Sequence, residues 1–533
     1  MAGEDGTVTD AVVIGSGPNG LVAANLLADA GWSVTVLEAQ QTLGGAVRTD
    51  TDVYEGFRHD TFSAFYPLAA ASATIQSLHL EDHGLSWVHA PAVLGNPLPS
   101  GGWAVIYRDP EKTAASLDAL QPGDGEAWLR LYGMWKGFGD DLIGALLTPF
   151  PPVRSGVRLA FSLPRAGGLS AYAFLLMSVR RLGRHFFTGE GPKLLLAGNA
   201  LHADFAPRNA GSGIFGLIMS MLAQTVGFPV PRGGAGELIT ALARRLESLG
   251  GTIVTGAEAT SVVVRDGRAV AVRTARGDEI SADRAVVADV SAPALYGGLV
   301  RLDDLPARTR WGIRRFTWDP STIKVDWALS SPVPWEPGPP DAPGTVHIAH
   351  SVEELGVFAA QIKGHTVPAA PLLLTGQMTA TDPTRSPAGT ESLWAYTHVP
   401  QQTRSDAGGA GIRGVWDGSD LERMADRMQA RIERFAPDFA SRILSRRAMG
   451  PREFEAHDAN LHGGAINGGT AALRQELVLR PVPGMGRSET PIKGLFLGSA
   501  SAHPGGGVHG APGANAAKAA LAHSDAPARA RRR

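Results

Sequence analysis

A glycine-rich segment near the N-terminus has the residue types and the spacing needed to bind a dinucleotide. Residues 15–20 read GSGPNG, a GxGxxG pattern, and Glu38 follows at the end of an apolar segment. Gly15 permits a tight turn, Gly17 lets the backbone approach a pyrophosphate, and Gly20 lets a helix pack closely on a strand. The N-terminus of that helix offers free N–H groups to phosphate, and Glu38 can accept hydrogen bonds from both ribose hydroxyls. The pattern predicts a dinucleotide site.

The elements around this loop have the order that such a site requires. Residues 11–15 (AVVIG) form a short apolar run, typical of a buried parallel strand. The apolar positions after the loop indicate a helix that ends at Gly31, a glycine suited to a left-handed C-terminal position. Residues 33–38 (SVTVLE) alternate as a second strand, which completes a β-α-β unit. A glycine cluster without this context is often an ordinary turn, and the context favours the nucleotide.

A second glycine-dense segment lies near the other end of the chain. Residues 494–498 (GLFLG) form an apolar strand that leads into residues 499–514 (SASAHPGGGVHGAPGA). Glycines let the chain pass close over a flat ring, and a helix beginning near Ala511 can point its N-terminus at the ring edge. His503 and His509 lie in this segment. Each could orient a substrate or accept a proton, or else only bond to solvent and backbone.

The first segment, extended to Gly44, Gly45 and Arg48, resembles the FAD fingerprint of the phytoene dehydrogenase-related family, which is akin to the flavin amine oxidases. The second segment is similar to the C-terminal flavin motif of that family. The resemblance covers almost the whole chain and is closest to the subgroup named for a pyridine nucleotide-disulfide oxidoreductase domain. It implies FAD, bound non-covalently, as the cofactor. Ser499 departs from relatives that place Asp after the glycine to hold the ribityl chain.

The resemblance also assigns residues to the site. It implies a backbone contact from Ala259 to adenine, and it matches Lys324 to the strand lysine that holds a water near flavin N5 in amine oxidases. A salt bridge between Lys324 and Asp326, which share a strand face, is the alternative. The candidates for catalysis are His503, His509 and Lys324. The residues expected at the cofactor are Gly15, Gly17, Pro18, Asn19, Gly20, Glu38, Ala39, Gly44, Gly45, Arg48, Ala259, Gly498, Ser499, Gly507, Val508 and Ala511.

The fold class expected is α/β, a two-dinucleotide-binding (Rossmann-like) FAD domain with an interleaved α+β substrate domain. We expect the FAD domain in residues 1–75, 230–300 and 450–525, the substrate domain in residues 76–229 and 301–449, and a disordered basic tail in residues 526–533. Residues 50–210 should be helical and aromatic, with Pro-rich breaks near residues 91–99 and 149–152. Alternating segments such as residues 321–329 and 372–378 predict an antiparallel sheet, and residues 420–435 predict a helix.

Composition narrows the classes of partner. The chain has 533 residues, 44% hydrophobic and 19% charged, a balance typical of a globular protein with more than one core. A formal net charge of −2 offers no general attraction for nucleic acid, so we expect none as a partner. The absence of cysteine excludes disulfides, thiolate metal sites and a CxxC redox relay, and we expect no metal.

Two segments raise the question of a membrane. Residues 209–231 carry no charge, but their Gly, Ser and Gln content favours a buried helix over a span. Residues 154–187 interleave arginines with Leu, Phe and Ala, and could rest on an anionic membrane or form an ordinary amphipathic surface. Residues 1–10 show no secretory signal, so we expect a cytoplasmic protein, with peripheral contact at the inner face of the membrane left open.

Together these features predict an FAD-dependent oxidoreductase, a dehydrogenase, desaturase or oxidase that transfers hydride from CH–CH groups of a hydrophobic, isoprenoid or polyene substrate to flavin N5. The alternatives are a flavin amine oxidase, a flavin-dependent isomerase or saturase, and a non-enzymatic flavin-bearing protein that docks on a membrane or partner. Because no second GxGxxG follows a strand, we expect dioxygen or a quinone as the electron acceptor. A homo-oligomer is left open.

Overall fold

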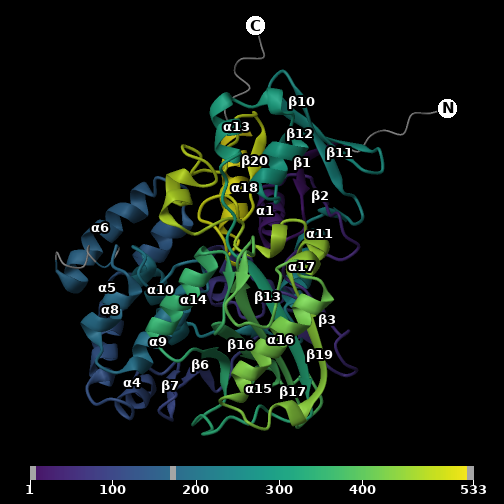
Figure 1. Ribbon diagram of the computed structural model, residues 1–533. Helices are drawn as coiled ribbons and strands as arrows, with labels where there is room; N and C mark the ends of the chain where they lie inside the picture. The colour runs from purple at the N-terminus through teal and green to yellow at the C-terminus, as the bar shows by residue number, and fades with distance from the viewer. Residues whose placement is uncertain (1–7, 169–173, 175, 525–533) are drawn as a thin grey trace.

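The computed structural model describes residues 8–168, 174 and 176–524, and the predicted basic tail at residues 526–533 lies outside them. Two large sheets form the frame, one in the upper half of the view in Figure 1 and one in the lower half. Segments from the beginning, the middle and the end of the chain contribute to the upper sheet. The mixed α/β architecture with a Rossmann-like unit confirms the predicted fold class.

The upper sheet has seven strands in the order β10-β11-β12-β1-β2-β9, with β20 paired to β12. The strands β1, β2, β9, β12 and β20 run parallel to one another, while β10 and β11 form an antiparallel hairpin at the edge of the sheet. Parallel strands are buried on both faces, which explains why β20 and residues 11–14 of β1 are continuously apolar. The strands are β1 (Val8–Ile14), β2 (Val34–Leu37), β9 (Thr252–Val254), β10 (Ala259–Arg265), β11 (Arg268–Thr274), β12 (Glu279–Ala288) and β20 (Leu495–Leu497).

Three helices cover one face of this sheet and bury a common apolar cluster with it: α1 (Pro18–Asp29), α11 (Gly236–Ser248) and α18 (Ala511–Ser524). Helix α1 packs against both α11 and α18, although α11 and α18 come from distant parts of the sequence. Helix α1 and the start of α18 agree with the sequence predictions, because each has a clear glycine or proline signal at its start.

The lower sheet also has seven strands, in the order β19-β13-β17-β16-β14-β6-β7. Strand β13 has the predicted bounds, residues 321–329, and all of its residues are buried. Helix α16 (Gly418–Glu433) covers one face through an apolar cluster that includes Trp327 and Met424. The strands are β6 (Ala92–Pro97), β7 (Trp103–Ile106), β13 (Ser321–Leu329), β14 (Pro343–Ile348), β16 (Leu373–Gln377), β17 (Glu391–Val399) and β19 (Ile443–Met449).

The expectation of a Pro-rich break at residues 91–99 is wrong, because β6 occupies this segment. Strand β6 is buried along its whole length and pairs in parallel with β14, so the lower sheet is mixed and not purely antiparallel. Gly95 fits there because a Cβ atom at this position would lie 3.0 Å from the Trp103 ring. Pairing with a distant strand and burial therefore outweigh the local Pro and Gly signals.

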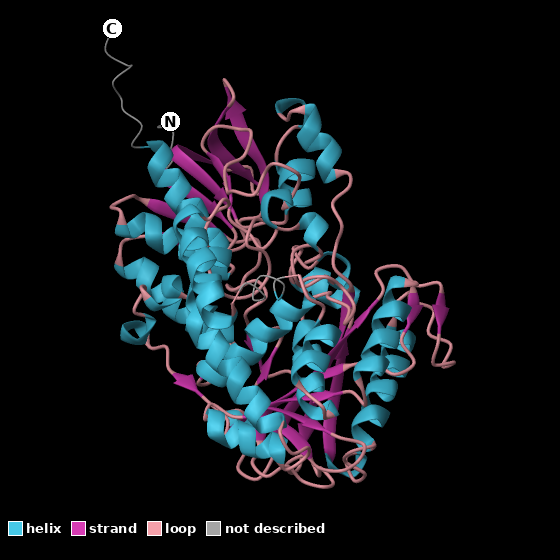
Figure 2. Cartoon of the chain, turned by 90° about the vertical axis from the view of Figure 1, so that its left-hand side faces the viewer, coloured by secondary structure: helices cyan, strands magenta, loops and turns pink. Residues whose placement is uncertain are grey.

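A helical layer covers the other face of the lower sheet, and Figure 2 looks onto it. Helix α10 coincides with the charge-free segment, and most of its residues are buried inside this layer. None of the described helices combines the length and apolar character of a membrane span. The layer consists of α5 (Asp124–Leu147), α6 (Val153–Gly167), α8 (Val179–Phe186), α9 (Glu190–Ala200) and α10 (Ser212–Thr225).

Shorter elements complete the fold. Among the described residues, the remaining α-helices are α2 (Pro67–Ala71), α3 (Ala73–Gln76), α4 (Pro110–Asp118), α12 (Ala292–Ala294), α13 (Ala307–Ile313), α14 (Val352–Lys363), α15 (Met378–Thr381) and α17 (Pro451–His457). The small two-stranded pairs are β3 (Thr49–Asp50) with β4 (His59–Asp60), β5 (Trp87–Val88) with β8 (Val230–Pro231), and β15 (Thr366–Val367) with β18 (Ser405–Asp406).

Candidate functional site

The two glycine segments predicted from the sequence lie against each other in the fold. A Cβ atom added to Gly513 in α18 would lie 1.9 Å from the carbonyl oxygen of Asn19 in α1. A Cβ atom added to Gly510 would lie 2.9 Å from Cγ2 of Val22. Only glycine allows so close an approach, so the C-terminal segment is seated directly on the N-terminal glycine loop.

The glycine loop has the geometry expected of a phosphate-binding turn. Gly15 has φ +97° and donates its N–H to the carbonyl of Leu37 at 2.8 Å, which couples the turn to β2. A Cβ atom on Gly20 would lie 2.2 Å from the carbonyl oxygen of Gly15, so α1 can start this close to β1 only with glycine at that position. The buried carboxylate of Glu38 accepts hydrogen bonds from the N–H and Oγ of Ser16, at 2.9 and 2.6 Å.

A buried acid that the sequence did not predict lies beside this loop. Asp289 directly follows β12, and its Oδ2 accepts the N–H of Gly20 at 2.7 Å. A Cβ atom on Gly17 would lie 2.8 Å from the same oxygen. Burial raises the pKa of Asp289 to about 7; the Gly20 N–H opposes the shift, and the charges of Asp458 and Glu38 add to it. The carboxyl therefore exchanges its proton near neutral pH.

The second glycine pair extends the same surface. Gly44, with φ +112°, donates its N–H to Oγ of Ser16 at 3.3 Å, and a Cβ atom on Gly45 would lie 3.5 Å from Cα of Gly17. Arg48 donates to the carbonyl of His457 at 2.8 Å and lies over the ring of Phe62, 5.2 Å from its centroid. Gly44, Gly45 and the loop thus form one continuous cradle.

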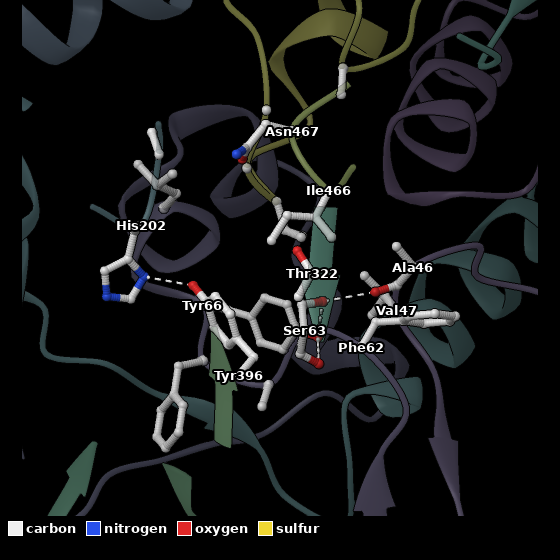
Figure 3. A pocket seen from close by; sticks show the side chains of 18 of the residues that line it. Ala46, Val47, Phe62, Ser63, Tyr66, His202, Thr322, Tyr396, Ile466 and Asn467 are labelled. Carbon is white, nitrogen blue, oxygen red and sulfur yellow. Dashed lines mark hydrogen bonds between the residues drawn. The ribbon is translucent and has the colours of Figure 1, made fainter. Parts of the chain in front are cut away.

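A cavity of about 310 Å³ opens where the glycine segments face the lower sheet (Figure 3). Pro18 and Asn19 line it from the glycine loop, and residues 506–508 line it from the C-terminal segment. In Figure 3, His202 faces Val47 and Phe62 from the opposite side. The chain thus brings both predicted glycine segments to one cavity.

The residues present fit an FAD molecule. Around the cradle and the cavity, Oδ1 of Asn19, Nε of Arg48 and Nδ2 of Asn467 are buried without a hydrogen-bond partner among the described residues. Buried polar atoms are normally paired, so these three indicate a polar ligand. A dinucleotide supplies the complementary groups.

Apolar side chains form most of the cavity wall. Among the described residues that line it, none is Asp or Glu, and Lys324 is the one with a permanent charge. Gly376 makes room for the Trp394 ring, since a Cβ atom there would lie 2.4 Å from Cε2 of that ring. The apolar lining residues include Val47, Phe62, Phe65, Leu68, Phe215, Met219, Phe228, Trp394, Phe454, Leu461 and Ile466.

Lys324 lies on the cavity wall but is fully engaged. Its Nζ donates to the carbonyl of Asp60 at 2.9 Å and forms an ion pair with Asp326. Burial alone would raise the pKa of Asp326, but Lys324, His59 and Arg447 outweigh it and hold that pKa below its ordinary value. Lys324 therefore reaches the cavity as half of an ion pair.

The two predicted histidines lie in the C-terminal segment but not on the cavity wall. Nε2 of His503 lies 2.9 Å from the carbonyl of Thr148, and Nδ1 of His509 accepts the N–H of Ala511 at 3.1 Å. Burial lowers the pKa of both, that of His509 to about 4. The structure thus gives the two imidazoles contacts that hold the backbone of the glycine segment.

The remaining predicted cofactor residues lie at the edges of the site. Gly498 directly follows β20 and donates its N–H to the carbonyl of Ala288 at 2.9 Å, while Oγ of Ser499 accepts from the N–H of Ser501. Ala39 follows Glu38 directly. The backbone carbonyl of Glu38 accepts the N–H of Ala257 at 2.7 Å. Ala259 lies two residues after Ala257, at the start of β10.

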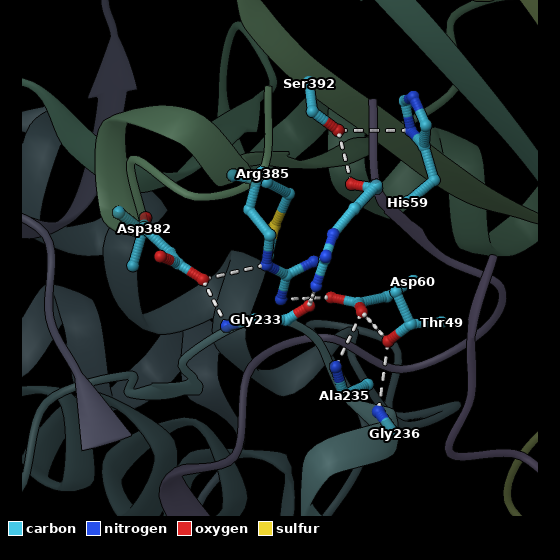
Figure 4. Close-up of polar contacts among 12 residues, drawn as sticks. Thr49, His59, Asp60, Gly233, Ala235, Gly236, Asp382, Arg385 and Ser392 are labelled. Carbon is cyan, nitrogen blue, oxygen red and sulfur yellow. Dashed lines mark hydrogen bonds and ion pairs between the residues drawn. The ribbon is translucent and has the colours of Figure 1, made fainter. Parts of the chain in front are cut away.

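A buried ion-pair network fastens the loop before α11 (Figure 4). Arg385 is fully buried and bridges Asp60 and Asp382, at 2.9 and 3.1 Å. Asp382 in turn accepts the N–H of Gly233, and Asp60 accepts that of Ala235, at 2.7 and 2.8 Å. The network joins segments far apart in the chain behind the cavity.

Sequence reasoning missed several cavity residues, among them Thr322, Trp394, Tyr396 and His202. The alternation of residues 391–399 (ESLWAYTHV) places Trp394 and Tyr396 on one face of a strand, which was a usable signal. Nothing in the local sequence marks His202. It lies in a turn after α9, and only the tertiary fold brings it to the wall.

The comparisons with known proteins agree with this geometry. A profile described as NAD(P)-binding Rossmann-like domain matches residues 13–78, and one described as flavin containing amine oxidoreductase matches residues 157–386. The mouse pyridine nucleotide-disulfide oxidoreductase domain-containing protein 2 is 28% identical, over 95% of this chain and 92% of its own length. The neurosporene-forming phytoene desaturase of Rhodobacter capsulatus is 25% identical, over 93% and 91%. A putrescine oxidase structure shares the fold, with a TM-score of 0.60, 17% identity and coverage of 97% and 99%.

A Rossmann-like unit with a flavin-type cavity against a second sheet defines an FAD-dependent oxidoreductase, and the matches confirm the predicted cofactor and enzyme class. The predicted resemblance is confirmed as well. The chain is similar to proteins of the phytoene dehydrogenase-related group, and its residues 157–386 match the flavin containing amine oxidoreductase profile.

Proposed function

We propose that this enzyme oxidises a CH–CH group of an apolar, isoprenoid-like substrate. The observation that carries the proposal is the cavity wall, which is apolar and has no carboxylate among its described residues. An alkylammonium ion would lose its hydration there without gaining a counter-ion, because the Asp326 carboxylate is already paired with Lys324. A hydrocarbon chain has no such penalty, since burying it is favourable by about 25 cal/mol per Å².

The roles of the chain's own residues follow from their places. The loop at residues 15–20 and Gly44 and Gly45 would hold the diphosphate, Glu38 would bond the ribose, and residues 506–508 would lie along the ring system. FAD held here supplies the hydride acceptor. The apolar wall orients the substrate and keeps water away from the reacting carbon atoms.

Anaerobic bleaching tests this proposal. The FAD-loaded enzyme is mixed with phytoene in detergent micelles, with putrescine, and with dithionite as the positive control for reduction. We expect phytoene or another isoprenoid to bleach the flavin and putrescine to leave it oxidised. Bleaching by amines and by no isoprenoid would show instead that this is an amine oxidase. Bleaching by dithionite alone would favour the interaction-protein alternative.

Dioxygen or a quinone is the proposed electron acceptor. Among the described strands, a single glycine-rich turn of the dinucleotide type occurs, between β1 and α1, and FAD would occupy it. Stopped-flow mixing of the reduced enzyme with NADP⁺, dioxygen and a soluble quinone decides the point. Rapid reoxidation by NADP⁺ alone would contradict this assignment.

We also propose peripheral contact with an anionic membrane through α6. Val153, Val157 and Phe161 are 68, 53 and 63% exposed, and their spacing of four residues places them on one helix face. Exposed arginines at positions 154, 158 and 165 border this face. The enzyme should float with anionic vesicles at low salt and not with neutral ones. Failure to float with the anionic vesicles would end this proposal.

Finally, we propose the division into a cofactor domain (residues 1–75, 230–300 and 450–525) and a substrate domain (residues 76–229 and 301–449). The strands of the upper sheet come from the first set and those of the lower sheet from the second. Limited proteolysis with and without FAD tests the boundaries, because cleavage should fall near residues 75, 229, 300 and 449, where the chain passes from one domain to the other.

A further inference from the structure

Strand register places a row of four side chains, three of them polar, on the cavity face of the lower sheet. Lys324 in β13 is directly opposite Tyr396 in β17, Tyr396 is opposite Leu374 in β16, and Leu374 is opposite His347 in β14. Residues directly opposite each other in neighbouring strands point to the same face. Tyr396 and His347 therefore project from the same side of the sheet, with β16 between their strands.

His202 joins these two side chains from the helical layer. Its Nδ1 lies 3.3 Å from the hydroxyl of Tyr396, and its Nε2 lies 3.0 Å from Nε2 of His347 (the Tyr396 contact is drawn in Figure 3). Helix α9 has Gly198 where the His347 ring packs against it, since a Cβ atom on Gly198 would lie 2.6 Å from Nδ1 of His347. The result is an unbroken line from the cavity to a fully buried imidazole.

All three groups are neutral near pH 7. Burial, and then the neighbouring His398, lowers the pKa of His202 to about 4. Burial and His202 hold the pKa of His347 well below its ordinary value, and burial raises that of Tyr396. The other ionisable groups around the line are Lys324, paired with Asp326, and Asp204, whose charge acts on His398.

A neutral imidazole carries one proton, so this line has two arrangements. In one, the phenol donates to Nδ1 of His202, and Nε2–H of His202 donates to His347. In the other, His347 donates to His202 and His202 to the phenol oxygen, whose own proton then points into the cavity. A proton received at the phenol oxygen lets the phenol proton move to Nδ1 of His202 and the Nε2 proton of His202 move to Nε2 of His347, so the positive charge is carried two hydrogen bonds away from the cavity.

We propose that Tyr396, His202 and His347 form a proton relay for the oxidation. The inference rests on the proposed function. Making a C=C bond from CH–CH removes one hydrogen as hydride, with two electrons, to FAD; the second C–H bond gives its electron pair to the new π bond and releases H⁺. That proton passes to the Tyr396 oxygen, the phenol proton to Nδ1 of His202, and the proton on Nε2 of His202 to Nε2 of His347, which keeps its own proton on Nδ1 and becomes an imidazolium. A carbon next to an electron-deficient centre is strongly acidic, so weakly basic acceptors are sufficient.

The first test does not need turnover. In protein labelled with ¹⁵N-histidine, the ring nitrogen shifts of His202 and His347 report protonation and tautomer. We expect both rings to be neutral from pH 6 to 8 and the His202 shifts to change in Tyr396→Phe. The matched control is Tyr296→Phe, another buried tyrosine, whose hydroxyl has no partner among the described residues and which should leave the His202 shifts unchanged. A charged His202 at pH 7, or no response to Tyr396→Phe, would refute the relay.

The second test measures the rate of flavin reduction with the isoprenoid that bleaches the wild type. Tyr396→Phe and His347→Gln should each slow reduction about 100-fold with unchanged FAD affinity, and the double variant should be no slower than the slower single one. A rate within about twofold of wild type in Tyr396→Phe would refute the role in the reaction. If no isoprenoid bleaches the wild type, the proposed function fails, and the NMR result still decides whether the relay exists.

Discussion

The substitution Gly513→Ala tests the contact on which the cofactor site depends. Gly513 lies in α18, and the added Cβ atom would lie 1.9 Å from the carbonyl oxygen of Asn19. Real Cβ contacts are essentially never shorter than 3.0 Å, so the two helices must separate by about 1 Å. The obstacle is backbone, which cannot move aside as the end of a side chain can.

The magnitude follows from two opposing effects. Alanine is favoured over glycine inside a helix by about 1 kcal/mol. Overpacking costs about 1–3 kcal/mol, and contact with backbone places this case at the upper end. We therefore expect a net loss of about 2 kcal/mol. Because Asn19 lines the cavity, the same displacement should weaken FAD binding and raise its Kd.

The assay compares two helical glycines in the same protein. Gly133 in α5 has no atom within 4 Å of an added Cβ, so Gly133→Ala should gain stability from helix propensity and leave FAD binding unchanged. Urea unfolding and titration of apoprotein with FAD give both quantities. The reasoning is refuted if Gly513→Ala unfolds and binds FAD as Gly133→Ala does.

Three further predictions concern groups around the cavity. Arg385→Met strands two buried carboxylates and should cost about 3–5 kcal/mol in urea unfolding, and a loss below about 1 kcal/mol would contradict a structural role for the network. Burial raises the pKa of Asp289 to about 7, so the stability that its neutral form gives the apoprotein is complete below about pH 4 and is lost as pH rises through 7. FAD affinity should fall as pH rises through 7, because the carboxylate then forms beside the diphosphate loop. In Asp289→Asn, both the stability and the FAD affinity should become independent of pH over this range. Gly376→Ala should push the Trp394 ring, 2.4 Å from the added Cβ, into the cavity, which weakens binding of a bulky isoprenoid while the FAD titration stays unchanged.

The parts of the fold that could be predicted are those encoded locally. The strand at residues 321–329 has the predicted bounds because its alternation is uninterrupted, and the β-α-β unit follows from a glycine turn between two apolar runs. Strand β6 could not be predicted in the same way. Its stability comes from pairing with β14, about 250 residues away, and local Pro and Gly residues conceal it.

The residues of the candidate site likewise separate into those that a local motif marks and those that only the tertiary fold brings together. Pro18, Asn19 and the glycines after Ala500 could be found because phosphate and flavin binding require a fixed local spacing. Motif membership did not predict orientation, since His503 and His509 lie in the segment yet bond to backbone. Tyr396, His202 and His347 have no common spacing, and only sheet register and helix packing bring them together.

The structure separates three tasks that a hydride-transferring enzyme must perform on an apolar substrate. Glycine segments on the upper sheet would hold the cofactor, aromatic and aliphatic side chains would select the substrate, and polar side chains of the row on the lower sheet would move the proton. Because these groups lie on different elements, a substitution such as Phe215→Ala should widen the cavity without loosening the diphosphate cradle or breaking the Tyr396–His202 contact. Substrate range can thus change by substitution of the wall alone, which explains how a single scaffold can serve different apolar substrates.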